Sequence, residues 1–427
     1  MRNKIFGLSA LMGALLATPT WAVEWDLAVN YTALHTTNTA RTTDNEIDEW
    51  IHQPGISVGA EHDGPNLQLS GGYQFERRIY EEDLFDDDSV TTGSAELLWH
   101  VVPERFDFVV RNSRTESARR SIEAITQDNR QVVSTTEAGP TLRFRTRGND
   151  EFQLSYLYTD VNAETQTSSK RHTGTARYIV AFSATRSLTF EASSSQVEFD
   201  NSAAPDLDIW IGSATLAQTG SNTELSLTGG YTSVSRSRGL DDVDGAIFDF
   251  DLTWQASPNT VLGISGSRRI DDRSSALRAG TSDFGDSVDA NSDLNEVFTE
   301  TMAEISLTRT FGRSRLGIRV FALQEDYEDV LRDNDRTGVG LTFGRDLTPL
   351  TTLSARIEVG TREFDDENEE LDEVRGNVQL VWRAGRRLTV SIGVAYEERE
   401  ADTLGTRDYD EWLARFGVSY ALLGSRR

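Results

Sequence analysis

The sequence contains no cysteine among its 427 residues, and this absence excludes several classes of protein. Without thiols the chain can form no disulfide framework, no cysteine nucleophile and no cysteine-ligated metal site. Histidine is scarce, at 5 residues, and there is no zinc-ligand spacing, P-loop or dinucleotide fingerprint. We therefore expect neither a resident cofactor nor a tightly held metal.

Long apolar runs are also missing, except at the start of the chain. The segment Ile5–Ala17 is apolar, follows the basic residue Arg2 and is too short to span a bilayer, which needs roughly 20 apolar residues. A small residue, Ala22, ends this region at a position typical of signal cleavage. We expect a secretory signal peptide at residues 1–22 and one mature domain at residues 23–427. No other stretch approaches the length of a spanning helix, which excludes a helical membrane protein.

Basic residues are few relative to acidic ones. The chain has 42 lysines and arginines against 69 aspartates and glutamates, a net charge of -27, which excludes nucleic acid as a partner. Hydrophobic residues make up 37% and the mean hydropathy is -0.45, values that resemble a soluble protein. Membrane β-barrels share this composition, because only alternate residues of their strands face lipid.

What the mature sequence does contain is alternation of apolar and polar residues. In the segment Thr351–Phe364, Leu353, Ala355, Ile357 and Val359 are apolar and polar or small residues separate them. Period two predicts a β-strand with two different faces. The same period recurs from Leu67–Phe75 to Trp412–Tyr420, so the chain is expected to be all-β throughout.

The connections between these segments are of two kinds that take turns along the chain. Nine are short, such as "HDGPN", "VPER" and "RAGR", and between them lie longer polar ones, such as "EEDLFDDDS" and "NSAAPDLD". Short turns on one side and long loops on the other are typical of outer-membrane barrels. This pattern predicts a transmembrane antiparallel up-and-down β-barrel of about 20 strands, within a range of about 18 to 22.

Tryptophans mark both ends of the predicted strands. One set directly precedes short turns and a second set directly follows long loops, which fits the two aromatic girdles of a bilayer-spanning barrel. The alternative is that they are core tryptophans of a soluble β-protein. The first set is Trp99, Trp254 and Trp382, and the second is Trp50, Trp210 and Trp412.

Charged residues fall on the polar face of the same strands. An arginine on a lipid face at mid-depth would cost roughly 2–4 kcal/mol, whereas inside a water-filled lumen it can hydrate and pair across strands. We therefore predict that these residues line the pore. They are Glu96, Asp107, Arg111, Arg143, Arg145, Arg177, Asp249, Asp251, Glu304, Arg319, Arg356 and Glu358.

Acidic residues crowd the stretch "REFDDENEELDEVR", Arg362–Arg375, between two predicted strands. We expect a long extracellular loop at its "DDENEE" segment, residues 365–370, and similar loops at Glu81–Asp88 and Arg399–Asp410, which together form a negative rim. The stretch lacks the spacing of an EF-hand. A solvated rim is the simpler interpretation, and loose divalent-cation binding that bridges to lipopolysaccharide is the alternative.

A rim hydrolase is a further alternative, since some outer-membrane barrels are proteases or lipases. His35 and His52 flank the first long loop, and Asp44, Asp48 and Glu49 lie nearby, so a histidine–carboxylate site is conceivable. No nucleophile motif such as GxSxG accompanies them. We therefore expect that the protein is not an enzyme.

One hairpin carries a resemblance to a known family. In Ala95–Ser113, Trp99 precedes the turn that contains Pro103 and Arg105, and a strand with alternating aromatics, Phe106 and Phe108, follows. This resembles a strand–turn–strand of the outer-membrane β-barrel proteins associated with exopolysaccharide export and exosortase (PEP-CTERM) systems in Gram-negative bacteria. In place of the acid that often closes that strand, Arg111 and Asn112 stand here.

The resemblance implies an outer-membrane location and a role in passing or anchoring an envelope polysaccharide, with periplasmic export components as partners. Together with the predicted barrel, it leads to one leading hypothesis: a pore or export conduit of the outer membrane, in contact with its lipid and lipopolysaccharide. The alternative hypothesis is a closed structural or adhesive barrel with an acidic extracellular rim. Its lumen would be filled by salt bridges across the strands or by the long loop Asp272–Asp293.

Overall fold

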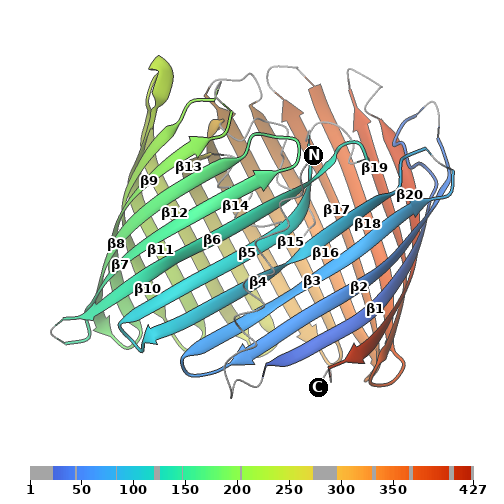
Figure 1. The fold of residues 1–427 in the computed structure, drawn as a ribbon, viewed down its shortest axis with the longest axis horizontal. Helices are drawn as coiled ribbons and strands as arrows, with labels where there is room; N and C mark the ends of the chain where they lie inside the picture. The colour runs from blue at the N-terminus through green and yellow to red at the C-terminus, as the bar shows by residue number, and fades with distance from the viewer. Residues whose placement is uncertain are drawn as a thin grey trace.

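The computed structural model describes residues 23–43, 46–82, 84–119, 126–146, 148–201, 204–272, 296–328, 333–364, 369–402 and 408–424. Nearly all of them lie in strands of a single sheet (Figure 1). The predicted signal peptide lies outside the described residues. Among the residues described there is no helix with the length and apolarity needed to cross a membrane; one short 3-10 turn, η1 (Ser237–Gly239), is present.

The sheet has 20 strands. They are β1 (Glu24–Thr36), β2 (Glu49–Asp63), β3 (Leu67–Tyr80), β4 (Asp88–Val102), β5 (Phe106–Ala118), β6 (Arg130–Arg145), β7 (Glu151–Ala163), β8 (Ser169–Ser183), β9 (Arg186–Phe199), β10 (Leu207–Thr219), β11 (Thr223–Arg236), β12 (Val243–Ser257), β13 (Thr260–Asp272), β14 (Val297–Phe311), β15 (Ser314–Tyr327), β16 (Asn334–Thr348), β17 (Thr351–Phe364), β18 (Glu369–Arg383), β19 (Leu388–Ala401) and β20 (Tyr409–Leu423).

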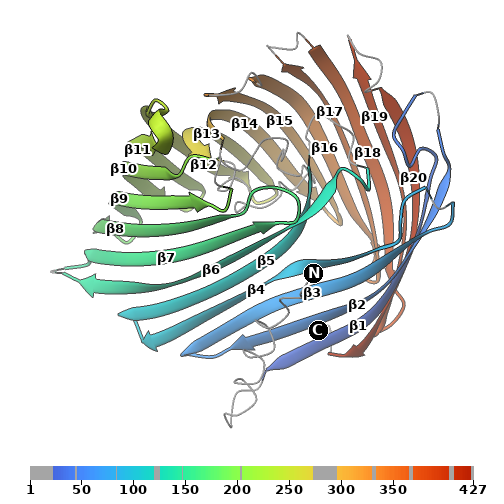
Figure 2. The same cartoon turned by 45° about the horizontal axis from the view of Figure 1, so that its top comes forward.

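Each strand pairs antiparallel with the next along the chain, and β1 also pairs with β20. The seam runs from Leu27↔Leu423 to Thr36↔Leu413, so the sheet is closed into a barrel of tilted strands (Figure 2). Closure satisfies the backbone hydrogen bonds of the edge strands, which is the condition for a sheet to span a bilayer. The predicted up-and-down barrel of about 20 strands is confirmed.

The strands are 13 to 16 residues long, whereas a bilayer crossing needs about 9–11 residues. They are therefore longer than a bilayer crossing requires. All nine predicted short turns connect strands at the end opposite the longer loops. One part of the loop prediction is wrong: β18 begins at Glu369, so the last two residues of the predicted loop, Glu369 and Glu370, belong to a strand. The acids at positions 365–368 lie outside the described residues.

Each strand has two distinct faces. On β18, β19 and β20 one face carries Val378, Val394 and Trp412, which are 51%, 46% and 52% exposed, and the other carries charged and small residues. The same division runs around the barrel, and the six predicted girdle tryptophans are all exposed on the apolar face. An apolar face this extensive is expected to contact lipid.

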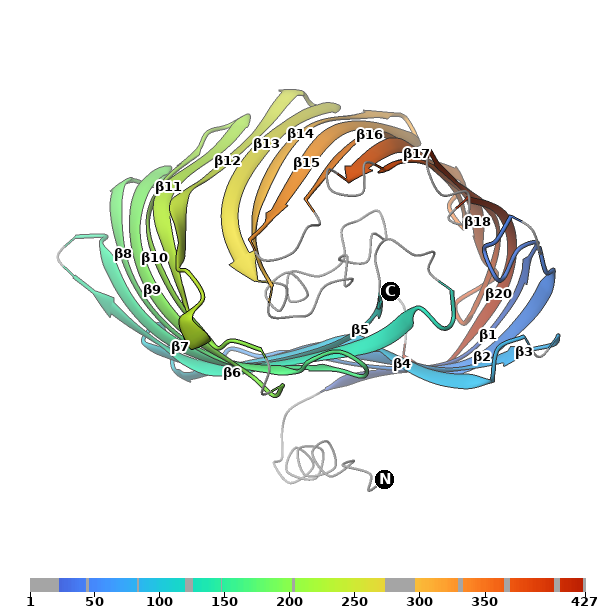
Figure 3. The same ribbon diagram turned by 90° about the horizontal axis from the view of Figure 1, so that it is seen from above.

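The opposite face is the inner wall, and its two halves differ near the long loops. From β6 to β14 the inner wall carries a buried aliphatic cluster that includes Val133, Val161, Val197, Leu207 and Val234. From β14 to β20 the wall carries charge. Figure 3 shows the barrel from above, with β7 to β13 forming one side and β14 to β20 the other.

Candidate functional site: a charged arc on the inner wall

The inner wall of β14 to β20 carries a chain of ion pairs that we call the charged arc. Its members alternate in sign, and Glu358, Glu373 and Glu397 each join two or more arginines. There are five arginines and five glutamates. They are Glu304, Arg319, Arg336, Glu358, Glu373, Arg375, Glu397, Arg399, Glu411 and Arg41.

The first half of the charged arc depends on a glycine. Arg319 on β15 pairs with Glu304 at 3.5 Å and with Glu358 on β17 at 2.9 Å. The strand between them, β16, places Gly340 opposite both Arg319 and Glu358. Because Gly340 has no side chain, the two charged groups meet across the intervening strand. Arg336 then joins Glu358, at 3.2 Å, to the second half of the charged arc.

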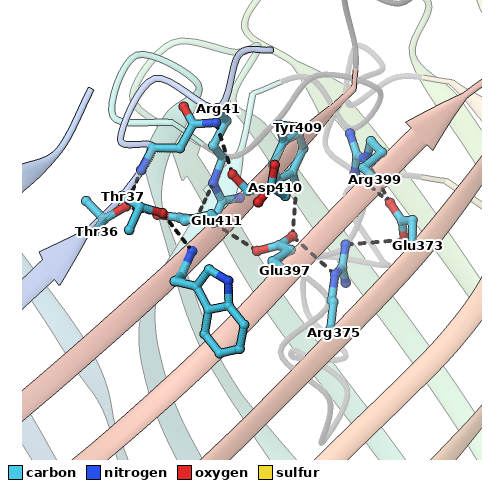
Figure 4. A network of polar contacts seen from close by, with 12 residues as sticks. Thr36, Thr37, Arg41, Glu373, Arg375, Glu397, Arg399, Tyr409, Asp410 and Glu411 are labelled. Carbon is cyan, nitrogen blue, oxygen red and sulfur yellow. Dashed lines mark hydrogen bonds and ion pairs between the residues drawn. The ribbon is translucent and has the colours of Figure 1, made fainter. Parts of the chain in front are cut away.

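Glu373 is the centre of the second half (Figure 4). Its carboxylate lies 2.6 Å from Arg399, 3.3 Å from Arg375 and 3.9 Å from Arg336. Arg375 reaches on to Glu397 at 3.3 Å. Glu373 belongs to the acidic stretch of the sequence but lies beyond the predicted loop, so part of that stretch contributes to the inner wall rather than to the rim.

The charged arc ends at the seam of the barrel. Arg41, in the connection between β1 and β2, pairs with Glu397 at 2.9 Å and with Glu411 on β20 at 2.7 Å, and Glu411 accepts a hydrogen bond from Thr36 on β1 at 2.5 Å (Figure 4). Burial alone would lower the pKa of Arg41, but Glu397, Tyr409 and Glu411 raise it above its ordinary value. Arg41 is thus a permanent cation that ties the first long connection to the last strand.

Outside the charged arc the wall opens between β4 and β5, and also between β12 and β13, whose pairing ends at Phe248↔Arg268. The β4–β5 ladder ends at Gly93↔Arg114, while the β5–β6 ladder continues to Ala118↔Arg130. Gly93 has φ +141°, and an added Cβ would collide with the carbonyl oxygen of Gly72. The segment Thr115–Ala118 therefore pairs with β6 alone and leaves β4, and Figure 3 shows the end of β5 turned in over the opening.

The turned-in end of β5 is held against the inner wall of β3. Arg78 forms two hydrogen bonds with Glu116, at 2.7 and 2.5 Å, and Tyr80 donates one to Gln127 at 2.8 Å. Arg78 and Tyr80 are both buried. We call residues Thr115–Ala118 and Thr126–Val132 the strap, since they cross from the β4–β5 wall toward the interior.

The predicted pore-lining residues all lie on the face opposite the exposed aromatics, and most are paired. In the sheet between β4 and β9 they form cross-strand pairs; Glu304, Arg319 and Glu358 belong to the charged arc. Asp249 and Asp251 are exposed on β12, and Arg356 is half-buried on β17. The cross-strand pairs are Glu96–Arg111 at 2.6 Å, Asp107–Arg143 at 2.6 Å, Arg145–Glu104 at 3.1 Å and Arg177–Glu191. That these residues line an open pore stays a prediction.

Most of the charged arc was missed by sequence reasoning. Arg336, Arg375 and Arg399 occupy inward positions that strand parity could have identified. The acids around them obscured the strand, because β18 begins with several acids on both faces and shows no apolar alternation there. The signal that could have found Glu373 is the apolar row Val374, Val378 and Leu380 read backwards from Trp382.

The histidines considered for a rim hydrolase lie on the outer face near the long loops. The ring of His52 shares a hydrogen bond with the Tyr31 hydroxyl at 2.7 Å and lies 2.7 Å from Glu81. His35 packs on Trp50, with ring centroids 4.8 Å apart. Glu49 is instead buried, and accepts hydrogen bonds from two backbone N–H groups after β3. Asp44 lies outside the described residues. In the described part of the chain neither histidine is bonded to a serine hydroxyl, so no nucleophile is assembled here.

Within the described ranges no cluster of three or more histidines, aspartates or glutamates could hold a metal ion. Divalent binding by the acidic loops stays a prediction, because the acids at positions 365–368 lie outside those ranges.

Comparison with known proteins adds evidence on the fold. No protein-family profile matches the chain, and no curated sequence matches it either. Solved structures do match. The FrpB iron transporter from Neisseria meningitidis (F5-1 variant) aligns with a TM-score of 0.54 at 10% identity, over 93% of this chain and 82% of FrpB. The siderophore receptor PirA from Acinetobacter baumannii aligns with a TM-score of 0.51 at 8% identity, over 95% and 81%. The fold is therefore that of an outer-membrane β-barrel.

Proposed function

We propose that this protein is an outer-membrane conduit for a hydrophilic solute of the exopolysaccharide class. The observation that carries the proposal is the charged arc. Its side chains are held by one another, with opposite signs in balance, so the wall offers many hydrogen-bonding groups but little net charge. A hydrated glycan can exchange hydrogen bonds along such a wall without being trapped at one point.

Two further observations support transport as the general class. The barrel shares its fold with FrpB, an iron transporter, and with PirA, a siderophore receptor. The hairpin around Trp99 and Pro103 resembles that of barrels associated with exopolysaccharide export. In this proposal periplasmic export components deliver the glycan at the short-turn end, and it leaves between the long loops.

Planar-bilayer recording of the purified barrel tests the proposal. We expect steady single-channel conductance, with an anion preference that falls when the inward arginines are replaced by serine. A barrel that is folded and inserted but carries no current, with the polysaccharide or without it, would contradict a conduit. The arginines to replace are Arg143, Arg145, Arg177, Arg319 and Arg356.

A closed structural barrel is the second candidate, and a different observation favours it. The strap leaves the wall and crosses toward the interior, and Arg171 on β8 pairs with Asp272 on β13 across the same end of the barrel. The strap and the Arg171–Asp272 pair both lie inside the barrel near the long loops. A silent barrel whose surface phenotype is lost on deletion of residues 365–368 would support this candidate; conductance that survives the deletion would support the conduit.

A further inference from the structure

Three arginines from separate elements come together where the strap meets the inner wall. Arg41 comes from the β1–β2 connection, Arg78 from β3 and Arg130 from the start of β6. Arg78 bonds to Glu116, and Glu116 lies opposite Val132, two residues from Arg130 on the same face of β6. The charges of Arg78 and Arg41 both act on Arg130, as do Glu116 and Tyr80. Three positive groups within reach of one another inside a protein repel, so each needs a source of negative charge.

Two of the three arginines are fully matched. Arg78 has the bidentate partner Glu116 and a second carboxylate, Asp88, at 3.9 Å. Arg41 has Glu397 and Glu411 within 2.9 Å. These pairs have the fork geometry and short distances of strong charge-assisted contacts.

Arg130 is different. Its side chain is only partly buried, and its guanidinium has no ion pair or hydrogen bond with any side chain in the described part of the chain. The carboxylate of Glu116, which also acts on Arg130, is already engaged by Arg78. A charge in such a place is unfavourable unless an anion reaches it, and the guanidinium can bind a planar or tetrahedral oxyanion through two N–H groups.

We propose that Arg130, supported by Arg78 and Arg41, forms an anion-binding site in the mouth of the barrel that takes a carboxylate or phosphate group of a solute. The site is set by the strap, because Arg130 reaches it only where Thr115–Ala118 leaves β4. It does not depend on the proposed conduit function, since a closed barrel presents the same arginine to the same mouth.

Calorimetric titration of the refolded barrel in detergent at low ionic strength tests the site. The probes are inorganic phosphate and D-glucuronate, with D-glucose as the neutral control. We expect phosphate or glucuronate to bind and glucose not to bind. Arg130→Gln is expected to weaken anion binding about tenfold or more, as for loss of a hydrogen bond to a charged group. Arg130→Lys, which keeps the charge without the fork, should fall between the two.

Arg77→Gln is the matched control, because Arg77 lies next to Arg78 on β3 but is exposed and pairs with Asp87 at 3.2 Å. It should leave the affinity unchanged. Circular dichroism and heat-modified gel mobility establish that each variant has folded. Binding of phosphate alone would identify a phosphate group as the ligand, and binding of glucuronate a carboxylate. Absence of anion binding to the wild-type barrel, or equal binding by Arg130→Gln and wild type, would overturn the site. Absence of single-channel current in a planar bilayer would contradict only the conduit and leave the anion site untouched.

Discussion

Arg171 and Asp272 form an ion pair although four strands, β9 to β12, separate theirs around the wall. Asp272 is fully buried and Arg171 is 5% exposed. A contact between strands so far apart in the sheet can be made only through the interior. The pair therefore identifies the inner face of the barrel independently of any hydropathy pattern, and it draws the end of β13 toward β8.

Removing one partner of this pair should destabilise the barrel. Arg171→Leu leaves the buried carboxylate of Asp272 without this partner, which is expected to lower the free energy of unfolding by about 3–5 kcal/mol. The double variant Arg171→Leu/Asp272→Leu should recover much of the loss. Urea unfolding of the barrel refolded into lipid vesicles measures both. Equal stability of the single variant and wild type would show that the pair is not formed.

Gly93 is expected to be irreplaceable at the place where the wall opens. Gly93→Ala puts a side chain at φ +141° and against the backbone of β3, so refolding yield and unfolding midpoint should both fall, with a strain of about 1–3 kcal/mol before the collision is counted. Gly212→Ala is the control, because a Cβ there meets nothing within 4 Å. If both variants refold alike, the strap does not need the opening at Gly93.

The two faces of β18 give a direct test of the membrane-facing surface. Val378 lies on the exposed apolar face and Gln379, its neighbour, on the inner wall. Val378→Arg should cost roughly 2–4 kcal/mol in a bilayer, whereas Gln379→Arg should be tolerated. The comparison requires refolding into lipid vesicles, since detergent adapts to either surface. Greater damage from the inner substitution would reverse the assignment of faces.

Gly340 should control the first half of the charged arc. Gly340→Val inserts a side chain between Arg319 and Glu358 and is expected to cost about 1–3 kcal/mol through crowding, with further loss from the separated charges. Gly344→Val, on the same strand and face, meets nothing within 4 Å and serves as control. Urea unfolding of the two variants measures the difference in their stability. A stable Gly340→Val barrel would mean that Arg319 and Glu358 reach each other by another route.

The sequence allowed prediction of the repeating parts of this fold. Alternation predicted the strands, and each short turn lies where a polar tetrapeptide or pentapeptide interrupts the alternation. Exposed tryptophans such as Trp99 and Trp412 also follow from local signals, since a girdle residue needs only its own strand end to be recognised. These features depend on neighbours within a few residues.

The parts that could not be predicted depend on positions far apart in the chain. Parity places Arg319 and Glu358 on one face, but their contact requires the register of β16 and the absence of a side chain at Gly340. Glu369 and Glu370 were assigned to a loop because the first residues of β18 are mostly acids and show no apolar row. The opening at Gly93 could not be predicted from the sequence pattern, because a glycine within a strand can have several different roles.

The seam has a consequence for how the molecule is made. Thr36 and Arg41 lie at β1 and just after it, and their partner Glu411 lies 375 and 370 positions later. Until the last strand has been delivered, Thr36 and Arg41 lack Glu411, and β1 presents an unpaired edge. The contacts of Thr36 and Arg41 with Glu411 can therefore form only after β20 is in place. A chain cut short before β20 remains an open sheet, which is exposed to proteases and to pairing with other chains.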